Sequence, residues 1–136
     1  MIDMHHWELR EVLACPFLRM LVPKGAGSTF LDAFAKKRQN REAAVYLAKT
    51  LQQVKRDGIA RSLAIGRIKR LKGRIVEVKV QGTVVRCLAY HGSGVSVLVL
   101  LSVERTHKGS GNMHRLIEEA ERKAALVEAL LEEREG

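Results

Sequence analysis

The feature that most constrains the fold is a pair of alternating segments, 74–80 and 83–90, separated by Gln81-Gly82. Alternation of apolar and other residues is the period-two pattern of a β-strand. A glycine at this point accepts the positive φ of a tight turn. The pattern predicts a β-hairpin with one fully apolar face, which would pack on helices and consist of Val76, Val78, Val80, Val85, Cys87 and Ala89.

The opposite face of this hairpin carries charge. Alternation predicts that Glu77, Lys79 and Arg86 stand together there, and further cations gather at one end, namely Lys69, Arg70, Lys72 and Arg74. This arrangement predicts a cationic concavity. Glu77 either holds the neighbouring cations in position or makes an ordinary cross-strand salt bridge with Lys79 or Arg86, worth about 0.2–1 kcal/mol.

Helical patterns flank the strands. Residues 30–37 have a helical pattern, and Asn40 is expected to be the N-cap of a helix that ends at Gly58. In that helix Ala44, Leu47, Leu51 and Val54 form one apolar stripe. Residues 59–66 are expected to be a connector. A long helix over 112–135 has an apolar stripe opposite a mostly acidic face.

Further strands complete the predicted sheet. Residues 5–13 suit a first strand, or a short helix as the alternative, because 15–22 show no clear period. Residues 67–71 suit a short strand before a Lys72-Gly73 turn. Residues 95–103 are almost continuously apolar, which predicts a central strand covered on both faces. The expected fold is α+β: a small twisted, mainly antiparallel sheet in one domain over 1–136, with its core at about 28–124.

Composition narrows the class of partner. The chain of 136 residues has a formal net charge of +9, yet residues 112–136 carry −3 and residues 55–79 carry +7. A cationic segment of this density favours a polyanion such as RNA. The longest apolar run is far shorter than the roughly 20 residues of a membrane helix, and the N-terminus has no signal pattern. We therefore expect a cytoplasmic protein that does not bind a membrane.

The segment "RLKGRIVEVKVQGTVVRCLAY…VSVLVLLSVERTHKG" resembles the RelE/HigB toxins of bacterial toxin–antitoxin modules, nearest their phage-associated HigB-like branch. Leu71-Lys72-Gly73 matches the start of the family's strand motif, and Glu77-x-Lys79 matches its Glu-x-Arg, with lysine for arginine. Arg86 matches the arginine of the returning strand, and Lys108 falls in the basic loop that follows. The resemblance covers most of 30–124 and implies a RelE-like sheet with two N-terminal helices and a long C-terminal helix.

The resemblance also implies a function. Such toxins cleave mRNA in the ribosome and are neutralised by an antitoxin encoded beside them, here expected to be a helix-turn-helix protein. The chemistry needs no metal or cofactor: the ribose 2′-hydroxyl attacks the adjacent phosphate. Arg86 would stabilise the phosphorane, since its planar fork matches phosphate oxygens. Lys79 would be the base, and His107 the general acid. The expected phosphate contacts are Lys69, Arg70, Lys72, Arg74, Arg105 and Lys108.

The chain departs from the family pattern in one respect. No Tyr, Phe or Trp follows Tyr90, where several members of the family place a stacking or proton-transferring aromatic, so this chain could bind RNA without cleaving it.

Two alternatives to a toxin stay open. A double-stranded RNA-binding module has the order helix, three strands, helix, but grips phosphate with lysines at the start of its last helix. A phage or mobile-element protein that binds the ribosome or a host protein is the other alternative, with the acidic helix as its partner surface or as a mask over the basic face.

Overall fold

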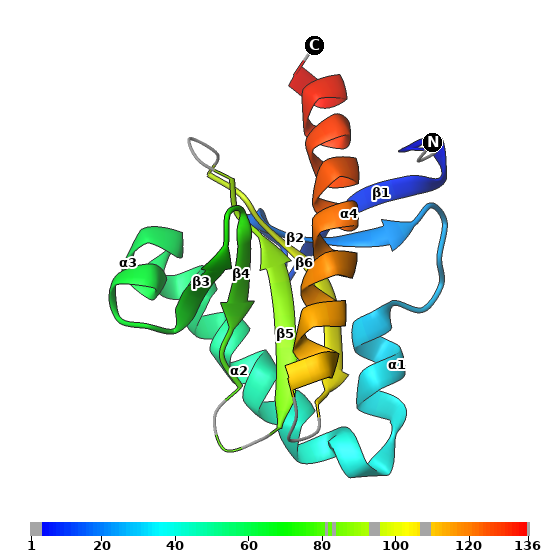
Figure 1. Cartoon of the computed structure of the whole chain (residues 1–136). Helices are drawn as coiled ribbons and strands as arrows, with labels where there is room; N and C mark the ends of the chain where they lie inside the picture. The colour runs from blue at the N-terminus through cyan, green and yellow to red at the C-terminus, as the bar shows by residue number, and fades with distance from the viewer. Residues whose placement is uncertain (1–3, 81, 83, 93–95, 107–109, 136) are drawn as a thin grey trace.

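A computed structural model describes residues 4–80, 82, 84–92, 96–106 and 110–135. Within these residues the structure is a six-stranded sheet with helices on both faces (Figure 1). The strands are β1 (Trp7–Val12), β2 (Cys15–Pro23), β3 (Ile68–Lys72), β4 (Ile75–Val78), β5 (Val85–Tyr90) and β6 (Leu98–Arg105). The helices are η1 (Met4–His6), α1 (Phe30–Lys36), η2 (Arg38–Asn40), α2 (Arg41–Asp57), α3 (Ile59–Ala64) and α4 (Ser110–Glu135).

The strand order is β1-β2-β6-β5-β4-β3. Among the described strands only β2 and β6 run parallel, and the other neighbouring pairs are antiparallel. The α+β class and the mainly antiparallel sheet are as predicted. β6 lies between β2 and β5, and its first four residues are buried, which confirms the central position expected from its continuous apolar run.

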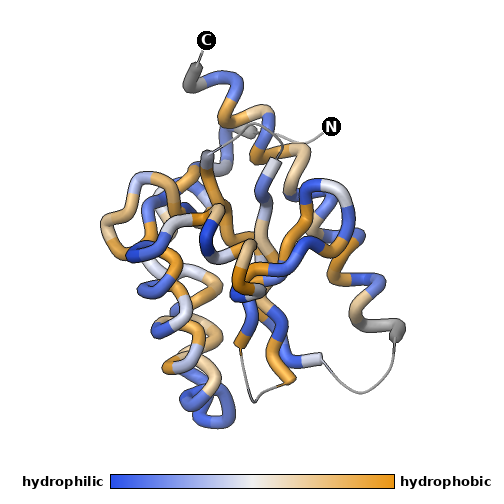
Figure 2. Tube along the Cα trace, turned by 90° about the vertical axis from the view of Figure 1, so that its left-hand side faces the viewer, coloured by the Kyte–Doolittle hydropathy of each residue, from blue (hydrophilic) through white to orange (hydrophobic). Residues whose placement is uncertain are grey.

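Two apolar clusters hold the layers together, one on each face of the sheet. On the first face the predicted hairpin face, including Val76, Val78 and Cys87, packs against α1 and α2 through Phe34 and Leu47. On the second face Ile75, Leu88, Tyr90, Val99 and Leu101 pack against α4, whose buried residues include Leu116, Ala120, Ala124 and Val127. Figure 2 shows α4 alternating between hydrophobic and hydrophilic residues along its length, as an amphipathic helix does.

The second face of the sheet is therefore not the exposed cationic concavity that the charge pattern predicted, because α4 covers it. Ile75, Leu88 and Tyr90 are at most 1% exposed beneath α4. Each fully buried side chain of this size contributes about 1.5–3 kcal/mol by leaving water. Charge remains accessible only around the rim of this layer, because the apolar stripe of α4 needs the middle of the face.

The N-terminal strand prediction was incomplete. A β1–β2 hairpin replaces the single strand expected over 5–13, and its register pairs Val12 with Cys15 across Leu13 and Ala14. Both turn residues have positive φ, 55° and 52°, as a two-residue type I′ turn requires. That turn normally uses Asn or Gly, so the sequence carried no signal for it. The ammonium of Lys55 donates to the Leu13 carbonyl oxygen at 2.8 Å and fixes the turn on α2.

The segment 59–66, expected to be a connector, contains α3. Gly58 stops α2 with φ 88°, as predicted, and the chain immediately enters the next helix. Asp57 holds this junction: its carboxylate accepts from Arg56 at 2.8 Å and from Arg67 at 3.0 Å. Arg67 also donates to the Ser62 hydroxyl at 3.1 Å, so one guanidinium joins α2, α3 and the start of β3.

The Arg56 and Arg67 hydrogen bonds hold the pKa of Asp57 well below its ordinary value of 3.8. A depressed folded-state pKa contributes stability that is complete above the unfolded-state pKa and is lost as pH falls through the folded-state pKa. We expect Asp57→Asn to lower the melting temperature by a few degrees at pH 7. The difference from wild type should shrink as pH falls below about 4. Thermal melts followed by circular dichroism between pH 2 and 8 measure it; a difference independent of pH would contradict this assignment.

Candidate nucleic-acid interface

The charged residues of β4 and β5 meet at the end of the sheet where β4 stops and β5 starts. Glu77 on β4 is 5% exposed, and its carboxylate accepts a hydrogen bond from Arg86 Nη1 at 2.7 Å. Of the two partners that the alternation allowed, Arg86 therefore takes the contact. The Arg86 side chain is 45% exposed, so a buried carboxylate anchors a guanidinium that still faces solvent.

The sheet register extends this contact into a row of alternating charge. Lys69 on β3 lies directly opposite Glu77, and Arg86 lies opposite Glu104 on β6. Directly opposite residues of antiparallel strands share a face, so these four residues lie on the α4 side of the sheet. Arg115 of α4 closes the row by donating to Glu104 at 3.0 Å and to Glu119 at 2.9 Å. We call Lys69, Glu77, Arg86, Glu104 and Arg115 the charge row.

Lys79 does not join this contact. It follows β4 and lines a cavity of about 380 Å³ with Tyr46, Lys49 and Arg67, between α2 and the start of β3. Its backbone N–H donates to the Arg67 carbonyl oxygen at 3.0 Å, which continues the β3–β4 pairing. Among the described residues, no hydrogen bond joins Lys79 to Glu77 or Arg86; the carboxylate of Glu77 is engaged by Arg86. The expected grouping is therefore present only in part: Glu77 and Arg86 are in contact, whereas Lys79 lines a separate cavity beside α2.

The acidic helix α4 neutralises the far end of the same face. Glu121 pairs with Lys72 at 3.4 Å, and Glu128 pairs with Arg74. Glu128 also accepts from the Tyr90 hydroxyl at 3.2 Å. Burial, reinforced by the Glu128 charge, raises the pKa of Tyr90 to about 12. Of the two roles expected for the acidic helix, the mask is present in part: α4 packs on the sheet and pairs with two of the expected phosphate contacts, although the Lys72 side chain stays 68% exposed.

The other expected site residues lie apart from the charge row. Arg70 donates to the carbonyl oxygens of Gly73, at 2.8 Å, and His91, at 3.3 Å. Arg105 donates to the Gln39 carbonyl oxygen at 3.0 Å, on the α1 side of the sheet. His107 and Lys108 lie outside the described residues. Thr106, directly before them, bonds the Val84 carbonyl oxygen through its N–H and its hydroxyl, which ties the end of β6 to the start of β5.

Neither cysteine suits nucleophilic chemistry. Cys15 and Cys87 are buried free thiols in the apolar cluster on the α1–α2 face. Burial, and then the charge of Glu77, raise the pKa of Cys87 to about 12. This thiol remains protonated at neutral pH, as a structural cysteine does.

Known proteins offer no assignment for this arrangement: no protein-family model, no curated protein and no solved structure matches the chain. Among the described helices, none is long and apolar enough to cross a membrane.

The Glu77–Arg86 contact should be energetically stronger than the exposed ion pair beside it. We expect a double-mutant cycle with Glu77→Gln and Arg86→Gln to give a coupling energy of about 1 kcal/mol, because Glu77 is shielded from water. The matched control is Glu104→Gln with Arg115→Gln, whose side chains are 41% and 52% exposed. Urea unfolding measures both cycles, and equal coupling energies would contradict the view that Glu77 anchors Arg86.

Proposed function

We propose that this chain is a toxin of a type II toxin–antitoxin module, similar to the RelE/HigB toxins, that cleaves mRNA on the ribosome. The observation that supports it best is the buried Glu77 holding Arg86 with its guanidinium still 45% exposed to solvent. A guanidinium has five N–H donors. Glu77 engages Nη1, so further donors remain for the oxygens of a phosphate.

The order of elements supports the same proposal. Helices α1 and α2 follow the β1–β2 hairpin and cover one face of the sheet, and after α3 the strands β3, β4, β5 and β6 follow, each antiparallel to the next. The Glu77-x-Lys79 motif, the returning Arg86 and the end of β6 then occur at the same end of the sheet, because the β4–β5 and β5–β6 pairs are antiparallel. This is the order expected from the resemblance of the sequence.

In the proposed reaction, the ribose 2′-oxygen forms a bond to phosphorus while the bond from phosphorus to the 5′-oxygen breaks. Lys79 is the proposed acceptor of the 2′-hydroxyl proton, and His107 is the proposed donor to the leaving 5′-oxygen. This assignment requires the RNA to reach from Arg86 to the cavity beside α2 that Lys79 lines. Arg86 stabilises the charge that the phosphorane gains. The products are a 2′,3′-cyclic phosphate and a free 5′-hydroxyl. The partners of this function would be mRNA, the ribosome and a helix-turn-helix antitoxin.

The start of α4 argues against a double-stranded RNA-binding module. Such modules need free cations at the N-terminal turn of the last helix. Here Arg115 pairs with Glu104 and Glu119, and His114 lies 2.9 Å from Glu118. Phosphate would have to displace these carboxylates.

Binding to the ribosome without cleavage is the second candidate. It is favoured because the only described aromatic that is exposed beside cations, Tyr46, lies on the α2 side and not beside Arg86.

Arg86→Ala provides the direct test. We expect induction of the wild-type chain in bacteria to arrest growth and fragment mRNA. Loss of the guanidinium should slow cleavage about 10²–10³-fold, the usual effect of removing one donor that stabilises a transition state. Growth curves and mapping of mRNA 5′ ends measure this. The control is Arg61→Ala, which removes an exposed arginine of α3 on the opposite side of the sheet.

The outcomes separate the candidates. Equal and harmless expression of all three proteins would remove the enzymatic proposal. Growth arrest with intact mRNA and with ribosome binding would favour the non-catalytic candidate. Tighter binding to isolated duplex RNA than to ribosomes would favour the double-stranded RNA-binding alternative.

A further inference from the structure

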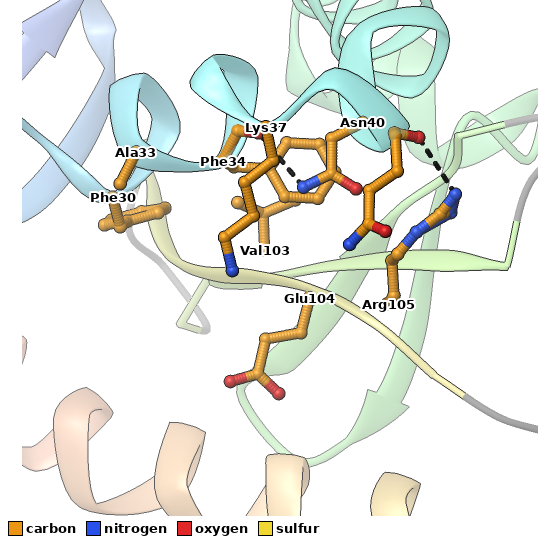
Figure 3. Close-up of a pocket in the computed structure, with 9 residues that line it drawn as sticks. Phe30, Ala33, Phe34, Lys37, Asn40, Val103, Glu104 and Arg105 are labelled. Carbon is orange, nitrogen blue, oxygen red and sulfur yellow. Dashed lines mark hydrogen bonds between the residues drawn. The ribbon is translucent and has the colours of Figure 1, made fainter.

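A second cavity lies on the other side of the sheet from Arg86, with a volume of about 410 Å³ (Figure 3). Its walls come from α1, from η2 and from the end of β6. The β2–β6 register ends at Met20 opposite Leu100, so the last five residues of β6 face α1 at this edge instead of a strand. A volume of this size is within the range of small-molecule sites.

The wall of this cavity contains a buried acceptor without a partner. Asn40 is 3% exposed, and its Nδ2 donates to the Phe34 carbonyl oxygen at 3.0 Å. Its Oδ1 accepts no hydrogen bond from the described part of the chain. The expected N-cap bond to α2 is also not made by this side chain. Leaving a buried acceptor unsatisfied costs about 1–3 kcal/mol, so the position calls for a donor from outside the chain.

Two cations flank Asn40. Lys37 and Arg105 both line the cavity, and neither is paired with a carboxylate among the described residues. The Arg105 guanidinium is held in place by the Gln39 carbonyl oxygen, as the dashed line in Figure 3 marks. Glu104 also lines the cavity, but its carboxylate is paired with Arg115 of α4 at 3.0 Å. The cavity therefore favours an anion at its rim.

Aromatic rings supply the remaining wall. Phe30 is half-buried and Phe34 is 8% exposed, and both line the cavity. A ring wall, a buried amide acceptor and two cations are together the groups that bind a flat heterocycle carrying a donor and a phosphate.

We propose that this cavity binds one nucleotide of an RNA strand, with a base amine donating to Asn40 Oδ1, the base stacked on Phe30 and the phosphate held by Lys37 and Arg105. Asn40 Oδ1 is shielded from solvent, so the side chains of the cavity wall must shift for the base to reach it. This inference rests on the proposed function for its source of nucleotide. Arg105 pairs with Val85 and Arg86 pairs with Glu104, and these are consecutive pairs of the β5–β6 register. One RNA strand that passes round this end of the sheet can therefore contact both arginines.

The test uses isolated 5′-mononucleotides and no ribosome. We expect AMP to bind at least 5-fold tighter than purine riboside monophosphate, which lacks the amine, or CMP to bind at least 5-fold tighter than UMP, as titration calorimetry measures. The double variant Lys37→Gln with Arg105→Gln should lower the affinity for the tighter-binding nucleotide at least 10-fold. The control is Lys36→Gln with Arg38→Gln, which removes the same charge from exposed neighbours that do not line the cavity and should change binding less than 3-fold.

Failure of this inference is distinguishable from failure of the proposed function. No discrimination within either nucleotide pair, or equal losses in the two double variants, would overturn the nucleotide site even if Arg86→Ala abolishes cleavage. If Asn40→Ala removes the difference in affinity between the two nucleotides, and the circular dichroism of this variant matches wild type, the nucleotide site is supported. This holds even if the chain proves harmless in bacteria. If Asn40→Ala does not fold, the comparison of nucleotides on wild type and the two charge variants still decides the question.

Discussion

Burial of β5 and β6 on both faces is the constraint on which the rest of the structure depends. Residues from Leu88 to Tyr90 and from Leu98 to Leu101 are almost completely buried. Neither strand could leave one face in water without exposing a continuous apolar surface. One face therefore needs α1 and α2, and the other needs α4. Once α4 occupies its face, charge can remain only where the helix does not reach.

The position of α4 decides which cations remain available to a ligand. Its acidic side meets the β3–β4 turn, where Glu121 and Glu128 pair with Lys72 and Arg74. At the other end of the sheet Arg86 is held by a buried carboxylate and stays half exposed. The carboxylates of α4 thus pair with cations at the β3–β4 turn, where Lys72 still stays 68% exposed, whereas Arg86 is held by a carboxylate of the sheet itself. This buried anchor beneath an exposed guanidinium is what makes the end near Arg86 the candidate site.

Much of the fold and part of the site could be predicted from local pattern. The hairpin face of Val76, Val78 and Cys87, the central β6 and the stop of α2 at Gly58 all follow from periodicity and glycine chemistry. The Leu13-Ala14 turn could not be predicted, since its residues are atypical of positive φ, and α3 could not because a six-residue helix has little periodicity to read. The sequence did not single out Lys37 and Asn40 as lining the proposed nucleotide cavity, because this cavity forms only where α1 and η2 meet the end of β6.

The sequence by itself determined the alternation that puts Glu77 and Arg86 on one face, because neighbouring strands impose a period of two wherever they form. It also determined that the C-terminal helix is amphipathic and acidic. Only the tertiary structure decided that this helix covers the charged face, and that Glu77 chooses Arg86 while Lys79 lines a cavity beside α2. These outcomes depend on register, strand ends and packing between segments far apart in the chain, and no local pattern encodes them.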